Sequence, residues 1–264
     1  MMSDFIFYIM EKTNRYKLID TLRGLSVISM ILFHACWIMS YFGILIPTET
    51  MFGFWFTVWE RSICFGFILI AGYSFSLGRR HLRSGLIIFA WGLVVMAVTC
   101  FFLPEIRIIF GILTFIGSAC LITILVDKAV GNTVAKSRKA AIVGFSLSVL
   151  LFVLTYSINR GYIGISPYRV ALPKGLYKGM AATYIGFTEP GFFSTDYFSI
   201  FPWYFLYLCG YMLYRIVKGT EAETFVVDHG IKSIEFLGRH SLPIYIIHPV
   251  VIYAFIAFLS TCVL

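Results

Sequence analysis

Three ionisable side chains lie on one face of the first long apolar segment of this chain. The segment runs from Ile19 to Trp37 and contains Asp20, Arg23 and His34. At ~100° per residue, eleven residues return to within ~20° of the starting azimuth, so Arg23 and His34 share a helix face, ~16 Å apart along the axis, and Asp20 lies within ~60° of it. An ionisable side chain is costly in hydrocarbon, so we interpret His34 as a functional group that faces the interior of a helix bundle.

The rest of the chain is strongly apolar. Of its 264 residues, 59% are hydrophobic and only 13% are charged, and the mean hydropathy is +0.88. A soluble domain of this size cannot bury so much apolar surface. We therefore predict an all-α membrane protein, a polytopic bundle of about seven transmembrane helices. The expected spans are residues 18–40, 52–78, 84–103, 108–126, 140–158, 197–214 and 241–263.

The distribution of basic residues predicts the orientation of these spans. Fourteen of the 21 Lys and Arg residues fall on the side of the N-terminus and five on the other side. This asymmetry indicates an N-in, C-out topology in the cytoplasmic membrane, and it explains the net charge of +8 without nucleic-acid binding. A short apolar run at residues 5–10 lacks the flanks of a signal peptide, so we interpret it as an interfacial segment.

We treat residues 1–264 as a single transmembrane domain with one long exoplasmic loop. That loop, residues 159–196, holds six glycines, three prolines and many aromatic residues. Disordered segments are poor in aromatic residues, so a structured cap is favoured over a loose connector. The six cysteines lie in or beside apolar spans without metal-ligand spacing, and we expect neither disulfides nor a metal site.

Helix depth suggests which polar groups could share a site. With the predicted directions, His34 lies ~9 Å and Arg61 ~13 Å below the outer end of their spans, and Glu60 is beside Arg61. Asp196 opens the sixth expected span from the same surface. Glu60 and Arg61 could instead form a structural pair, and this alternative stays open. His248 lies only ~10 Å from the opposite surface, so we expect His34 and His248 to lie at different depths and not to act on one atom.

A second group of polar residues marks the expected cytoplasmic end of the last span. Ser241 is the expected N-cap of this helix, and Arg239 and His240 flank it. A helix N-terminus beside basic residues can bind a phosphate, and Arg79 and Arg83 emerge on the same side of the membrane. Ordinary positive-inside anchoring would explain the same cluster, and both alternatives stay open.

The opening of the first span resembles that of the transmembrane acyltransferases. The stretch from Ile19 to Leu25, followed by His34, carries the similarity. The ten residues between Arg23 and His34 match a motif shared with the acyltransferase-3 proteins. Four further segments are similar, in the same order, to bacterial proteins with the heparan-α-glucosaminide N-acetyltransferase catalytic domain: residues 61–77, 110–117, 196–203 and 237–248.

This resemblance implies an integral-membrane acyltransferase. It would move an acyl group, by the same resemblance an acetyl group, from acyl-CoA on the cytoplasmic side to an amine or hydroxyl of a sugar or glycoconjugate on the far side. Acyl-CoA, a carbohydrate acceptor and the bilayer are the implied partners, a homodimer is left open, and no metal is implied. Thr114 stands where relatives often have histidine, and the large lumenal domain of the animal enzyme has no counterpart here.

The resemblance and the depth estimates together assign roles to fifteen residues. His34 is the expected catalytic base or acyl carrier, supported by Asp196 and Arg61. The residues expected to bind the acceptor substrate are Asp20, Arg23, Glu60, Tyr197 and Trp203. The residues expected to bind acyl-CoA are Arg239, His240, Ser241, Tyr245, His248, Arg79 and Arg83.

Two other functional classes compete with the enzyme hypothesis. A proton-coupled transporter or flippase could use the stripe of Asp20, Arg23 and His34 as a relay, but the chain shows no internal repeat. A packing or assembly subunit would leave the ionisable residues of the spans unexplained.

Overall fold

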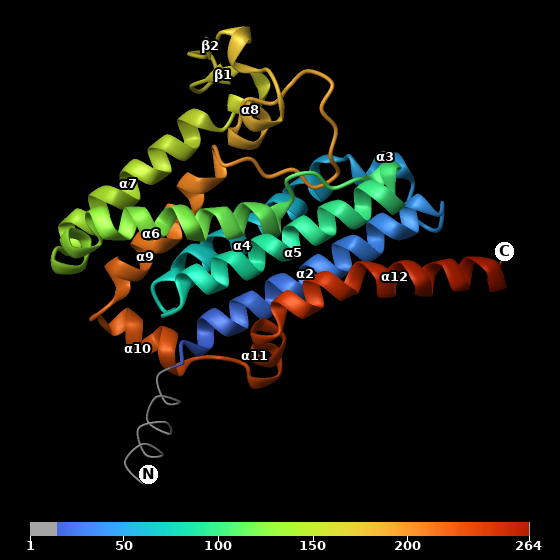
Figure 1. Cartoon of the computed structure of the whole chain (residues 1–264). Helices are drawn as coiled ribbons and strands as arrows, with labels where there is room; N and C mark the ends of the chain where they lie inside the picture. Colours follow the sequence, from blue (N-terminus) through green and yellow to red (C-terminus); the bar gives the residue numbers. More distant parts are fainter. Residues whose placement is uncertain (1–14, 264) are drawn as a thin grey trace. The chain divides into compact units, whose positions relative to one another are not determined.

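The computed structural model describes residues 15–263, so the apolar run at residues 5–10 lies outside the described part of the chain. The described residues divide into two compact units. The first contains the residues up to 67 and those from 217 onward, and the second contains residues 68–216. Figure 1 labels the helices and strands of both units.

The prediction of a polytopic helical membrane protein is confirmed. Within residues 15–263, six helical segments are long and apolar enough to cross a membrane. Helices suit this setting because each one satisfies its own backbone hydrogen bonds, which lipid cannot do. These segments are Lys17–Tyr41 (α2), Phe54–Phe75 (α4), His81–Phe102 (α5), Ile112–Lys136 (α6), Arg138–Arg160 (α7, Arg138–Thr155, with the short helix η2, Ile158–Arg160) and Ser241–Leu259 (within α12, Ser241–Val263).

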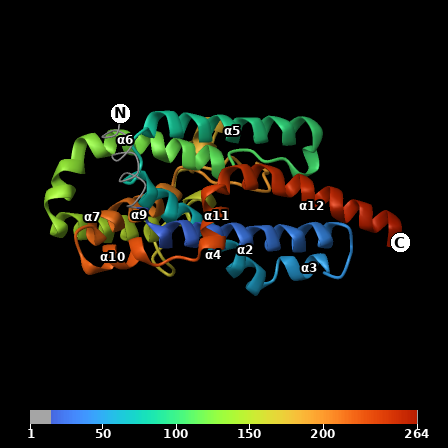
Figure 2. The same cartoon turned by 90° about the horizontal axis from the view of Figure 1, so that it is seen from below.

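The first unit is organised around α2. The other elements of this unit are α3 (Thr48–Met51), the first part of α4, α10 (Glu221–Asp228), α11 (Lys232–Arg239) and α12. Helices α10, α11 and α12 all pack against α2. Figures 1 and 2 both show α12 lying along α2, so the last helix of the chain is a direct neighbour of the first long one.

Helices α2 and α12 run in the same direction. His34 of α2 meets His248 of α12, and further along both helices Phe42, just after α2, meets Tyr253, with ring centroids 5.4 Å apart. If α2 and α12 both span the membrane, their parallel direction requires an odd number of crossings, which is the expectation from the sequence. This agrees with termini on opposite sides, while the absolute direction, N-in, stays a prediction.

The second unit is built on close helix contacts at glycines. A Cβ atom on Gly117 of α6 would lie 2.6 Å from the backbone nitrogen of Phe89 in α5, and one on Gly92 would lie 2.5 Å from that of Thr114. Gly72 of α4 and α9 (Trp203–Val217) are equally close. Small residues let transmembrane helices approach until their backbones touch, which replaces the hydrophobic driving force that lipid does not provide.

The sixth expected span, residues 197–214, differs from the prediction. Its helix, α9, begins only at Trp203 and has 15 residues, about 22 Å at 1.5 Å per residue, because Pro202 and the residue before it are disfavoured in a helix. The non-helical stretch from Asp196 completes the path. Asp196 contacts the first residue of α6, and Tyr211 contacts Asp127 further along α6. The segment 196–215 therefore runs beside α6 over most of its length, and its crossing of the membrane as a seventh span stays a prediction.

The segment 159–196 is structured. It contains a small antiparallel ribbon in which Tyr162 pairs with Ala171 and Ile163 with Val170. Its elements are β1 (Tyr162–Ile163), β2 (Val170–Ala171), η3 (Lys174–Leu176) and α8 (Met180–Ile185), and a further short helix, η1 (Pro104–Ile106), lies between α5 and α6. Its exoplasmic location stays a prediction, as does the expectation of one domain.

Candidate active site

Two histidines meet between α2 and α12 in the first unit. His34 Nδ1 and His248 Nε2 are 3.0 Å apart, and the ring centroids are separated by 4.9 Å. His248 is 6% exposed, and His34 is half-buried. We call His34 and His248 the histidine pair. The two imidazoles form a direct hydrogen bond although the two histidines are 214 positions apart in the sequence.

The hydrogen bonds of the pair determine where its protons lie. His248 Nδ1 is 3.0 Å from the carbonyl oxygen of Ile244, and a carbonyl oxygen can only accept. The proton of neutral His248 is therefore on Nδ1, and its Nε2 must accept from Nδ1–H of His34. In this arrangement Nε2 of His34 keeps a free lone pair, the atom that a general base or a nucleophile needs.

A proline next to His248 supports this proton assignment. Pro249 lies inside α12 and has no N–H, so the carbonyl group of Tyr245, four residues earlier, lacks its usual helical donor. The His248 ring hydrogen-bonds the carbonyl of Ile244, the residue just before Tyr245. The ring of Tyr245 also makes an edge contact with that of His248, with centroids 5.8 Å apart. The proline thus frees a backbone carbonyl one turn before His248.

The expectation that His34 and His248 lie at different depths is wrong. The depth estimate placed Ser241 at the cytoplasmic end of the last span. In the structure α11 crosses α2 at Asp20 and Gly24, so α12 starts alongside the interior of α2 and not beside its first residue. The expected capping role of Ser241 is also shifted by one residue, because the carbonyl of His240 accepts from the N–H of Ile244.

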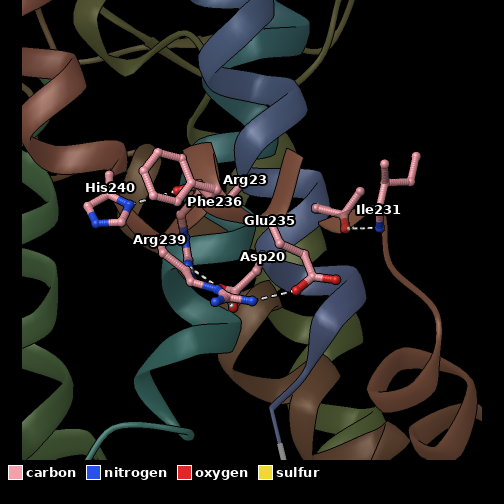
Figure 3. A network of polar contacts seen from close by, with 8 residues as sticks. Asp20, Arg23, Ile231, Glu235, Phe236, Arg239 and His240 are labelled. Carbon is pink, nitrogen blue, oxygen red and sulfur yellow. Dashed lines mark hydrogen bonds and ion pairs between the residues drawn. The ribbon is translucent and has the colours of Figure 1, made fainter. Parts of the chain in front are cut away.

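A network of four charged residues joins α2 to α11 (Figure 3). Arg23 Nη1 donates to Asp20 Oδ1 at 2.8 Å, and Arg239 Nε lies 3.7 Å from Asp20 Oδ2. Arg239 Nη2 also donates to Glu235 Oε2 at 2.5 Å. We call Asp20, Arg23, Glu235 and Arg239 the charge network. Its two carboxylates and two guanidinium groups compensate one another, so the residues expected to bind substrate or acyl-CoA here are already paired within the protein.

Backbone contacts reinforce the charge network. The N–H of Ile231 donates to Thr21 Oγ1 at 3.0 Å. Gly24 and Gly238 have no side chains, and a Cβ atom on either would overlap the backbone oxygen of the facing helix. His240 Nδ1 lies 2.9 Å from the carbonyl oxygen of Phe236, so the His240 ring folds back on α11 (Figure 3). These contacts define the position along the α2 axis at which α12 begins.

The sequence predicts Glu60 and Arg61 of α4 beside His34, but the structure turns them away from the side of α4 that faces α2. Trp59 marks the side of α4 that faces α2, because its Nε1 donates to Ser29 Oγ at 2.8 Å and its ring is 5.5 Å from that of Phe33. Arg61 lies ~200° further round α4 and Glu60 ~100°. Arg61 therefore projects from the side of α4 away from α2, and its role beside His34 stays a prediction.

The remaining expected site residues belong to the second unit and have local roles there. Asp196 Oδ2 accepts from the N–H of Ile112 at 3.1 Å and thus caps α6. Tyr197 donates to the carbonyl of Thr183 at 2.5 Å. Trp203 is buried beside Phe198, with ring centroids 4.9 Å apart.

Arg79 and Arg83 are exposed residues that flank the start of α5. Their position in the second unit is compatible with a basic surface. Acyl-CoA binding by Arg79 and Arg83 stays a prediction, as do the roles of the other three residues of this unit in substrate binding or catalysis.

Sequence reasoning missed Glu235 and Pro249. Glu235 is 4% exposed although the buried residues of its short helix, Glu235 and Gly238, are not its large apolar ones. A signal for it was available, since Glu235 and Arg239 are spaced i, i+4 on a helix. The His248–Pro249 dipeptide was a second signal, because proline inside a span frees a backbone carbonyl.

Comparison with known proteins adds one match. The sequence model of the family described as heparan-alpha-glucosaminide N-acetyltransferase, catalytic, matches residues 15–250. The matched region includes both members of the histidine pair and the whole charge network. Neither the comparison with curated proteins nor that with solved structures gives a significant match.

Proposed function

Because this chain belongs to the heparan-α-glucosaminide N-acetyltransferase catalytic family, membrane acetyltransferases that use acetyl-CoA, we propose that it transfers an acetyl group across the cytoplasmic membrane. The donor is acetyl-CoA on the cytoplasmic side, and the acceptor is an amine or hydroxyl of a carbohydrate on the far side. The observation that carries this proposal is the histidine pair, which leaves Nε2 of His34 free inside the region matched by the family.

The free nitrogen of His34 suits acyl transfer. As general base, Nε2 takes the proton of the acceptor amine or hydroxyl while the acceptor attacks the thioester carbonyl. The new C–N or C–O bond forms, the C–S bond breaks, and the thiolate of coenzyme A leaves with the proton. Alternatively, Nε2 attacks the carbonyl itself and carries the acetyl group to the acceptor.

His248 has a positioning role in either route. Its Nε2 accepts the hydrogen bond of His34 Nδ1–H and so holds the His34 ring in one tautomer and one orientation. When His34 gains a proton, this hydrogen bond becomes charge-assisted and therefore stronger. A base that is oriented by a third group is the arrangement found in catalytic triads.

The donor side of the proposal relies on the residues near the start of α12. Tyr245 contacts the His248 ring, so a thioester that approaches along this face of α12 would reach the histidine pair. Arg239, His240 and Ser241 of the first unit remain the proposed contacts for the phosphates of acetyl-CoA, and the contribution of Arg79 and Arg83 stays a prediction from the sequence. Arg239 would have to exchange part of its contact with Glu235 or Asp20 to do so.

The residues that favoured a transporter have another explanation. Asp20 and Arg23 pair with each other and face α11, which supports a structural function for two members of the supposed proton relay. His34, ~21 Å further along α2 than Asp20, has a histidine partner of its own. The structure of the first unit therefore supports the enzyme over the relay.

The test is transfer by the purified full chain in lipid nanodiscs. The substrates are acetyl-CoA and a hexosamine acceptor, and coenzyme A release is followed with a thiol reagent. His34→Asn keeps a donor near the position of Nδ1, which can still reach His248, but removes Nε2. We expect it to slow transfer by about 10²- to 10⁴-fold, the usual contribution of a general base.

His81→Asn is the matched control, because it removes an imidazole from the second unit, and it should remain within twofold of the wild type. Transfer at the wild-type rate by His34→Asn would overturn the catalytic assignment. Substrate flux across sealed vesicles without acetyl-CoA, with no transfer at all, would instead support a transporter.

A further inference from the structure

The charge network and the histidine pair belong to one and the same helix interface. Both join α2 to the segment that contains α11 and α12, and only His240 separates these two helices. His248 lies seven residues, ~10 Å, beyond the first residue of α12. Any slide of α11 along α2 would therefore be passed on to His248.

We propose that the charge network is a positioning device that sets the register of α12 on α2 and so holds His248 against His34. The catalytic consequence rests on the proposed function, whereas the register itself does not. Glu235, Thr21 and Asp20 act through His248 as positioning residues and touch no substrate.

Three kinds of contact support a defined register. Gly24 and Gly238 allow backbone contact, which fixes the distance between α2 and α11 but tolerates sliding. The N–H of Ile231 on Thr21 Oγ1 is directional and opposes sliding. Arg239 reaches carboxylates of both helices, Asp20 of α2 and Glu235 of α11, so it lies at the crossing point itself.

The histidine pair requires a defined register because its hydrogen bond tolerates only a small displacement of either ring. Its single hydrogen bond is 3.0 Å long, and an N–H···N bond is lost when the atoms move apart by more than about half an ångström. No opposite charge attracts the two neutral rings toward each other. Their contact must therefore be imposed by the packing of α2 against α11 and α12.

The first experiment is a double-mutant cycle on the transfer rate. Glu235→Gln with Thr21→Val removes one charge and one directional acceptor with little change of shape. We expect kcat at saturating acetyl-CoA to fall about tenfold, with KM for the acceptor within twofold of the wild type. In a His248→Leu background the same two substitutions should lower kcat by no more than twofold, because the interaction that they support is already absent.

A purely structural role would give a different result. It would lower kcat by the same factor in both backgrounds, and that result overturns the proposal. An unchanged kcat in the Glu235→Gln, Thr21→Val protein overturns it too. Glu223→Gln is the matched control, because Glu223 lies on α10 and hydrogen-bonds Tyr16 just before α2 without contact to α11. It should leave kcat within twofold.

The second experiment measures the proximity of positions 34 and 248 by cross-linking and does not depend on enzymatic activity. His34→Cys and His248→Cys are combined in a chain whose native cysteines are replaced, and a short bifunctional thiol reagent joins them. We expect the cross-linking rate to fall at least fivefold when Glu235→Gln and Thr21→Val are added. An unchanged rate overturns the positioning proposal even if the chain is an active enzyme, and a slower rate supports it even if no transfer is found.

Discussion

Two regions of α2 hold ionisable side chains in different ways. Near its start, the charge network pairs two carboxylates with two guanidinium groups, and opposite charges satisfy one another. About four turns later, the histidine pair joins two like groups that are neutral, and one ring nitrogen of His34 is left over. Compensated charges stabilise helix packing, whereas an oriented group with a spare lone pair can do chemistry. The difference teaches that an ionisable residue in a membrane span is not by itself a catalytic one.

The largest expected effect concerns the stability provided by the charge network. Asp20→Ala removes the carboxylate that contacts both Arg23 and Arg239, so it should lower the free energy of unfolding by about 3 kcal/mol. This is the low end for buried ion pairs, because the Asp20 and Arg23 side chains are 17% and 22% exposed. Reversible denaturation in detergent measures it. Asp228→Ala on α10 is the control, an exposed carboxylate that should change stability by less than about 0.5 kcal/mol. Equal losses in both variants would remove the distinction between the two regions.

The next effect concerns activity and the histidine pair. His248→Gln keeps an acceptor near the position of Nε2, whereas His248→Leu has none. We expect kcat to fall about a hundredfold in His248→Leu, the low end for acid–base catalysis, and about tenfold or less in His248→Gln. Both variants should unfold within about 1 kcal/mol of the wild type, because no compensating charge is lost. If Leu and Gln behave alike, the hydrogen bond to His34 does not matter to the reaction.

The smallest expected effect is a pH dependence of the free energy of unfolding, which comes from Glu223 on α10. Burial acts to raise the pKa of Glu223, but hydrogen bonds from Tyr16 and the Gly219 N–H, with the nearby charge of Lys218, outweigh it and lower the pKa overall. The folded state therefore prefers the carboxylate, and this stabilisation is present above the unfolded pKa of about 4.3 and is lost as the pH falls through the lower folded value.

Tyr16→Phe should reduce that stabilisation by less than about 1 kcal/mol, because solvent screens the partly exposed Glu223 carboxylate. The free energy of unfolding measured between pH 3 and pH 7 checks it. The variant and the wild type should converge at the acidic end of this range. A constant gap at every pH would show that Tyr16 acts only through packing.

Parts of the candidate site were predictable from the sequence, and parts were not. His34 was found because an ionisable residue interrupts an apolar run, and its face was found from helical periodicity. The sequence also indicates His248 as an ionisable residue of a span, but helical rise counted from Ser241 does not predict its contact with His34. The roles expected for Asp20, Arg23 and Arg239 assumed side chains open to ligands, whereas the structure pairs them. Pairing depends on which helices adjoin, and helical rise along one segment does not contain that information.

The sequence by itself determined the class of this protein. Apolar runs of span length, punctuated by basic loops, dictate a polytopic helix bundle, because lipid permits only segments that satisfy their own backbone. Ordered motifs over nearly the whole chain determined the family. Only the tertiary structure decided that Gly24 and Gly238 bring α11 across α2, and that this crossing sets His248 beside His34. The physical reason is that the register of one helix along another is set by contacts between residues more than 200 positions apart, and no local sequence pattern predicts such contacts.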